Sequence, residues 1–139
     1  MKAGTYNEAV TIPGSAAITI VGETSSSNDY SQNKVIISTS GVPMTIGTEA
    51  VLNTVWKNIN FVTSSTSTTA YAVYLRGTKN AFYNCQMVSA GNQAIYSTYG
   101  IAFISGSYVE AATQTFAGYL GMYVFVSKSG SSQSPSDSP

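Results

Sequence analysis

The sequence contains no histidine and only six acidic residues among its 139 positions. The lack of histidine excludes catalytic triads built on imidazole and most zinc sites, because histidine is the commonest general base and a leading metal ligand. Neither a metal ion nor any other cofactor is therefore expected. A hydrolytic mechanism with two paired carboxylates must draw on the six acidic side chains. These are Glu8, Glu23, Asp29, Glu49, Glu110 and Asp137.

Charge of either sign is scarce. Charged residues make up 9% of the chain, and six basic residues balance the six acidic ones. Nucleic-acid-binding proteins carry a basic footprint, so we expect no nucleic acid partner and no charge-held membrane surface. No apolar run reaches the roughly 18 residues of a transmembrane helix, and residues 1–10 lack the apolar core of a signal peptide. A neutral surface rich in hydroxyl groups and aromatic rings suits carbohydrate binding or a structural role.

Cysteine occurs once, at Cys85, which excludes an intrachain disulfide. The apolar residues around Cys85 are expected to face inward. We therefore interpret it as an inert thiol in the core rather than a reactive one.

Short runs of β-branched and aromatic residues are abundant, and such runs are typical of β-strands. No segment has a sustained apolar stripe at helical spacing with caps, so we expect no long helix. The strand candidates are Ala9–Ile12, Ala17–Gly22, Lys34–Thr39, Ala70–Leu75, Asn80–Val88, Gln93–Tyr96, Ile101–Ile104 and Met122–Val126.

The strand candidates repeat. Two sets of residues recur at offsets of 22 and then 21, and a third match, between Trp56–Val62 and Phe82–Val88, has an offset of 26. The first set is Ala72–Tyr74, Ala94–Tyr96 and Thr115–Ala117, and the second is Phe82, Ile104 and Phe125. Periods of about 20–50 residues indicate a solenoid. Short strands without helices favour an all-β parallel β-helix over helical repeats, and over a β-sandwich with accidental spacing.

Two glutamines occupy matching points of this repeat. Residues one coil apart in a parallel β-helix lie about 4.8 Å from each other. Gln93 and Gln114 are 21 residues apart, so we expect them to be direct neighbours, with Tyr71 one coil before them. Asn58 and Asn84 are also one coil apart, and we interpret them as a structural ladder at repeating turns.

The chain divides into a β-helix over residues 1–128 and a tail over residues 129–139. The tail is rich in serine and proline, a composition typical of disorder or a linker. Thr24–Asn33 and Thr63–Ala70 are polar and are predicted to be excursions from the coils.

A resemblance to a known family is carried by Gly4–Tyr6, Glu8, Ile18–Gly22, Asn80–Gln86 and Gly106–Gly118. These segments resemble the pectin methylesterases (pectinesterases), the fungal branch in particular. The likeness covers about Lys2 to Lys128 and keeps the order of the family. It implies a single-stranded right-handed parallel β-helix, shorter or truncated relative to the family domain. It also implies a secreted protein that acts on pectin (homogalacturonan) or a related polysaccharide in the cell wall, where the family hydrolyses galacturonate methyl esters to pectate and methanol.

The resemblance implies two catalytic aspartates on adjacent coils, one attacking the ester carbonyl and one protonating the departing methanol. The nucleophile position falls on Gln114. The acid position falls on Gln93 when counted from the downstream side, and on Asn92 when counted from Cys85. An amide cannot be the attacking group at neutral pH, so we predict a catalytically degenerate site. We interpret Glu110 as a solvated turn residue rather than a substitute nucleophile.

Aromatic side chains near these positions are the candidates for sugar contact. They are Tyr71, Tyr74, Tyr96 and Tyr99, and the alternative is that they only stack between coils, with some rings facing inward. The resemblance adds Thr115 to the substrate-binding positions, where the family carries a phenylalanine. Two functions stay open: a pectinesterase-type protein of pectin modification, and a non-catalytic polysaccharide-binding or relic β-helix.

A short solenoid leaves strand edges open at its terminal coils, and open edges pair with other chains. We therefore predict marginal stability or self-association through the coil ends. Sedimentation velocity and thermal unfolding test this prediction, and a monodisperse monomer with a high melting temperature would contradict it.

Overall fold

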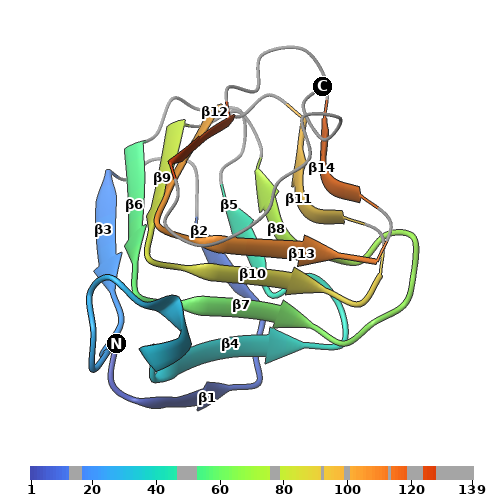
Figure 1. The fold of residues 1–139 in the computed structure, drawn as a ribbon. Coiled ribbons are helices and arrows are strands. Elements are labelled where there is room, and N and C mark those ends of the chain that lie inside the picture. The colour runs from blue at the N-terminus through green and yellow to red at the C-terminus, as the bar shows by residue number, and fades with distance from the viewer. Residues whose placement is uncertain are drawn as a thin grey trace.

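The computed structural model describes residues 1–12, 17–46, 53–75, 79–91, 93–98, 101–112, 114–118 and 124–127. The chain winds as a right-handed parallel β-helix, which confirms the predicted fold class (Figure 1). Within these described ranges, fifteen strands form three parallel sheets of five strands each. The only helix among the described residues is a short 3-10 helix, η1 (Tyr30–Gln32).

Each coil contributes one strand to each sheet, so every strand pairs with the strand three places along the chain. Sheet A consists of β1 (Gly4–Tyr6), β4 (Val35–Thr39), β7 (Asn60–Thr63), β10 (Gln86–Ser89) and β13 (Tyr108–Ala111). Sheet B consists of β2 (Val10–Ile12), β5 (Met44–Ile46), β8 (Tyr71–Leu75), β11 (Gln93–Ser97) and β14 (Gln114–Gly118). Sheet C consists of β3 (Ile18–Val21), β6 (Asn53–Lys57), β9 (Lys79–Tyr83), β12 (Ile101–Ser105) and β15 (Val124–Ser127).

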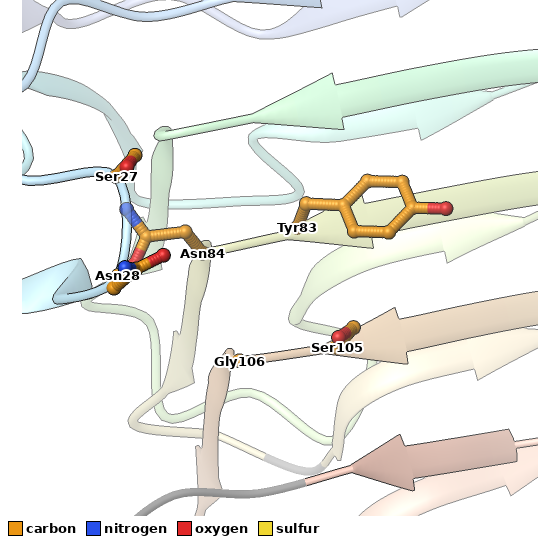
Figure 2. Close-up of a pocket in the computed structure, with 6 residues that line it drawn as sticks. All are labelled: Ser27, Asn28, Tyr83, Asn84, Ser105 and Gly106. Carbon is orange, nitrogen blue, oxygen red and sulfur yellow. The ribbon is translucent and has the colours of Figure 1, made fainter.

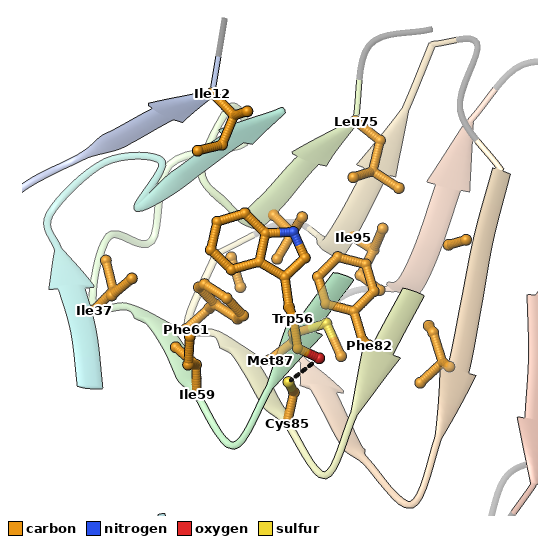
Figure 3. Close-up of a cluster of buried hydrophobic side chains, with 14 of the residues drawn as sticks. Ile12, Ile37, Trp56, Ile59, Phe61, Leu75, Phe82, Cys85, Met87 and Ile95 are labelled. Atoms are coloured by element: carbon orange, nitrogen blue, oxygen red, sulfur yellow. Dashed lines mark hydrogen bonds between the residues drawn. The ribbon is translucent and has the colours of Figure 1, made fainter. Parts of the chain in front are cut away.

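The core fills the space inside the coils with stacked large side chains. Trp56 packs edge-on against Phe61 with ring centroids 5.6 Å apart, and Phe61 packs edge-on against Phe82 at 6.2 Å. Figure 3 shows these rings converging from neighbouring strands. All three are fully buried, and burial of each such side chain stabilises the fold by roughly 1.5–3 kcal/mol.

Cys85 belongs to this core, as predicted. Its side chain is fully buried, and its Sγ–H lies 3.6 Å from the carbonyl oxygen of Trp56 (Figure 3). Burial raises the pKa of the thiol to about 12, against the opposing effect of nearby backbone hydrogen bonds. The thiol is therefore protonated at neutral pH, as expected of an inert core cysteine.

Tight turns connect sheet C to sheet A at the same point of successive coils. Asn58, Asn84 and Gly106 occupy these turns with φ angles of 58°, 51° and 58°. Asparagine and glycine tolerate this left-handed conformation best. The Asn84 Nδ2 donates to Oδ1 of Asn58 at 2.9 Å, which confirms the predicted asparagine ladder.

The polar excursion at residues 24–33 is attached to the same turns. A bridge between Thr24 and Asn33 closes it. Asn84 Nδ2 donates to the carbonyl of Ser26 at 3.0 Å, and Asn33 Nδ2 donates to the carbonyl of Asn84 at 2.7 Å. The asparagine ladder therefore holds both the coils and the excursion.

One predicted register is wrong. Ile104 pairs with Phe82 as expected, but Phe125 pairs with Phe103. The offset between coils is 21 where β11 meets β14 and 22 where β12 meets β15. The chain from β14 to β15 is therefore one residue longer than the chain from β11 to β12. The length of a turn can vary between coils, whereas the pairing of the strands cannot. The tail at 129–139 lies outside the described residues, so its disorder stays a prediction.

Replacement of Asn84 should separate the backbone effect from the hydrogen bonds. Asn84→Ala should lower the free energy of unfolding by about 2–4 kcal/mol, since alanine resists the left-handed conformation and leaves ladder partners unsatisfied. Asn84→Gly should be milder, because glycine adopts this conformation readily. Denaturant unfolding measures both, and a glycine variant as unstable as the alanine variant would show that backbone conformation is not the constraint.

Candidate functional site

Gln93 and Gln114 are neighbours in sheet B, as the repeat predicted. Gln93 at the start of β11 pairs with Gln114 on β14 and with Tyr71 on β8. The Gln93 side chain is 7% exposed. Asn92 and the side chain of Gln114 lie outside what the structure describes, so the choice between Asn92 and Gln93 for the acid position stays open.

Three tyrosines form one cluster on the outer face of sheet B. The rings of Tyr71 and Tyr96 stack with centroids 4.6 Å apart and planes at 13°. Tyr74 lies 5.3 Å from Tyr96 and 6.0 Å from Tyr71. All three are half-buried, so the rings stack between coils and also face solvent. We call these residues the tyrosine cluster.

A break in strand alternation places Tyr71 and Tyr74 together. Regular alternation would send two residues three positions apart to opposite faces of a sheet. In β8, however, the adjacent Ala72 and Val73 are both fully buried, and the half-buried residues on either side of them are the two tyrosines. Figure 1 shows the neighbouring strands β11 and β14 bending near their starts. The expectation that some of these rings face inward is therefore wrong for the three described tyrosines; Tyr99 lies outside the described residues.

The strands that carry these residues are uncharged. The five strands of sheet B contain no lysine, arginine, aspartate or glutamate. Burial, and then the neighbouring phenols of Tyr96 and Tyr74, raise the pKa of Tyr71. Its hydroxyl is therefore protonated at neutral pH and able to donate a hydrogen bond.

A serine- and threonine-rich loop at residues 64–69 borders the entrance to β11. Ser89 Oγ donates to the carbonyl of Ala70 at 3.2 Å, and the N–H of Gly91 donates to Ser89 Oγ at 3.2 Å. A Cβ at Gly91 would lie 2.7 Å from the carbonyl oxygen of Ser65 and 2.6 Å from that of Ser67. Only glycine allows this close approach. Gly91 was not singled out from the sequence, although a glycine two residues before Gln93 is the signal that could have indicated the approach.

Two acidic side chains considered as possible catalytic groups, Glu110 and Asp29, lie on other elements than the glutamines. Glu110 is exposed, as expected, but it lies within β13 of sheet A rather than in a turn. Its carboxylate accepts a hydrogen bond from the hydroxyl of Tyr108 at 2.6 Å, an interaction that raises the pKa of Tyr108. Asp29 caps η1 and accepts from the N–H and Oγ of Ser31. Both carboxylates therefore have structural partners on other parts of the molecule.

Thr115 lies in β14, and its side chain is outside what the structure describes. Within the described ranges, no group of three or more acidic, cysteine or histidine side chains could hold a metal ion. In the same part of the chain, no helix has the length and apolar character needed to cross a bilayer.

Comparison with known proteins points to one family. Over 127 residues the chain is 28% identical to Pectinesterase A of Emericella nidulans, an alignment that covers 85% of this chain and 39% of that protein. Over 125 residues it is 30% identical to Probable pectinesterase A of Neosartorya fischeri, covering 84% of this chain and 38% of that protein. The chain is related to the pectinesterases. It spans about two fifths of the length of these curated relatives, and no family model matches it.

Solved structures agree on the fold. The pectin methylesterase from Aspergillus niger in deglycosylated form aligns with a TM-score of 0.76 at 23% identity, covering 90% of this chain and 44% of that one. A second, penultimately deglycosylated form of the same enzyme aligns with a TM-score of 0.54 at 19% identity, covering 98% of this chain and 52% of that one. The β-helix predicted from the repeats is thus confirmed, and the similarity to the two curated pectinesterases supports the predicted relationship.

The close approach at Gly91 yields a prediction with a matched control. Gly91→Ala should lower the free energy of unfolding by about 1–3 kcal/mol, because the new methyl group would collide with two backbone oxygens. Gly41→Ala should be neutral or stabilise by up to about 1 kcal/mol, since a Cβ there meets nothing within 4 Å. Denaturant unfolding and near-ultraviolet circular dichroism of the tyrosines measure both variants. Equal stability of the two would contradict the packing of the loop.

Proposed function

We propose that this chain serves in pectin modification as a pectinesterase-type β-helix that binds pectin without hydrolysing its methyl esters. The observation that carries the proposal is the complete lack of charged residues on the strands of sheet B. Gln114 falls on the nucleophile position that the family resemblance implies, and its strand partner Gln93 is one of the two candidates, with Asn92, for the acid position.

Binding is supported by the tyrosine cluster. Stacked, half-exposed rings offer flat apolar faces beside hydroxyl groups, and a sugar ring presents the matching combination of C–H faces and hydroxyls. The loop at residues 64–69 adds further hydroxyl groups beside the entrance to β11. Methyl-esterified galacturonate carries no charge, so it loses little solvation energy against a neutral face. The sheet therefore suits esterified pectin better than pectate.

Hydrolysis is disfavoured by the side chains at the same place. Ester cleavage of the family kind needs one carboxylate as nucleophile and another as proton donor, with their pKa values held apart. A side-chain amide still forms hydrogen bonds, as the carboxylate of an aspartate does, but it can serve neither as the nucleophile nor as the proton donor. Glu110, the carboxylate nearest to Gln114 in the sequence, lies on β13 of sheet A. A pectin-binding role implies an extracellular location, which stays a prediction from the resemblance.

The test combines turnover with binding. Purified protein and the Gln114→Ala variant should both release no methanol from highly methylated pectin. Affinity electrophoresis should show binding that Tyr96→Ala weakens by roughly fivefold, the effect of losing about 1 kcal/mol of aromatic contact. Tyr108→Ala, on sheet A, is the control and should bind as the unmodified protein does.

Two results would overturn the proposal. Methanol release that disappears in Gln114→Ala would mean that an amide at this position supports catalysis, contrary to the mechanism. Equal binding by Tyr96→Ala and Tyr108→Ala, or no binding at all, would remove sheet B as the polysaccharide surface.

A further inference from the structure

A second aromatic surface lies on the outer face of sheet C. Tyr83 and Phe103 are 37% and 39% exposed, although both are large rings. Their centroids are 5.6 Å apart with planes at 51°. Alternation in β9 places Phe82 in the core and Tyr83 on the outer face. The exposure of Tyr83 therefore follows from regular strand geometry. Paired exposed rings on a chain this polar mark an interaction site.

A depression of about 370 Å³ has Tyr83 in its lining. Figure 2 shows Tyr83 and Asn84 along one side and Ser105 and Gly106 along the next coil. The excursion at residues 24–33 supplies the remaining lining through Ser27 and Asn28. The volume is at the low end of small-molecule sites, and the lining combines hydroxyl and amide groups with one aromatic ring. These are the groups that bind the hydroxyls and the C–H face of a sugar.

The charge on the strands of sheet C is positive, and the acidic residue in the excursion, Asp29, is engaged by the N–H and Oγ of Ser31. Lys57 Nζ lies 5.4 Å from the centre of the Tyr83 ring, and Lys57 pairs with Tyr83 across β6 and β9. Lys57 is exposed and forms no ion pair with any described residue. Lys57 and Lys79 are the only charged residues in the five strands of sheet C, which contain no acidic residue.

We propose that Lys57, Tyr83, Phe103 and the adjoining depression form a second polysaccharide-binding site, specific for uronate residues with free carboxylates. The rings stack on sugar faces, the depression holds one sugar unit, and Lys57 neutralises the carboxylate. We call this the sheet C site. It lies on a different sheet from the tyrosine cluster and goes beyond the proposed function, because its ligand is the unesterified form of the polymer.

A second copy of the chain fits this surface less well. A two-fold dimer through the rings would bring Lys57 of one copy toward Lys57 of the other, and no acidic residue on these strands could compensate. An anionic sugar satisfies both the rings and the lysine, so charge complementarity selects it.

The test is calorimetric titration with an unesterified galacturonate hexamer. Tyr83→Ala and Lys57→Gln should each weaken binding about tenfold, which corresponds to about 1.4 kcal/mol. Lys79→Gln is the matched control, because it removes the same charge from the other end of β9, about 13 Å away along the strand. Lys57→Arg should restore most of the affinity. Circular dichroism and unfolding curves check that each variant is folded.

Four outcomes would overturn the sheet C site. The first is no binding by the unmodified protein, and the second is unchanged binding in both Tyr83→Ala and Lys57→Gln. The third is an equal loss of affinity in Lys79→Gln, which would indicate diffuse charge attraction. The fourth is a dimer in light scattering that Tyr83→Ala abolishes. Titration of Tyr96→Ala separates this site from the proposed function. If Tyr96→Ala binds esterified pectin normally while Lys57→Gln loses the hexamer, the sheet B proposal fails and the sheet C site stands.

Discussion

Parallel pairing between successive coils is the constraint on which the rest of the structure depends. It places Phe82 beside Trp56 inside the helix and Tyr96 beside Tyr74 outside it. Because side chains alternate along a strand, a slip of one residue would exchange the inner and outer sets. The left-handed turns at Asn58 and Asn84 recur at the same point of each coil and hold this pairing between sheets C and A. Core, binding faces and polar excursion all follow from that repeat.

The sequence period predicted pairing well and side-chain direction less well. The repeat offset of 21 residues predicted that Gln93 lies beside Gln114, because strand residues one period apart pair with each other in adjacent coils. They could not place Phe125, since turn length between strands carries no periodic signal. The grouping of Tyr71 with Tyr74 also escaped prediction, because it depends on two consecutive buried residues that break alternation. The ring contact between Tyr83 and Phe103 also needed the register of sheet C, because the two residues are diagonal neighbours on adjacent strands.

The strands of the two outer faces differ in charge, and the two proposals assign these faces to one polymer in two chemical states. Sheet B has no charged residue on its strands, whereas sheet C has two lysines and no acid. Esterified galacturonate is neutral and free galacturonate is anionic, so under the two proposals desolvation and charge pairing direct them to different faces. A solenoid is suited to this arrangement, because each sheet presents its own row of side chains over several coils. In the proposed function, amides at the positions where the resemblance implies carboxylates leave recognition of the polymer in place.

The most direct measurement is saturation-transfer NMR of a fully methyl-esterified galacturonide oligomer in the presence of the protein. One sample reports contact with the sugar rings and the fate of the methyl esters at the same time. Binding without turnover predicts saturation of the sugar protons and a methoxyl signal that keeps its intensity for hours. Accumulating free methanol would contradict the loss of catalysis, and unsaturated sugar protons would contradict recognition.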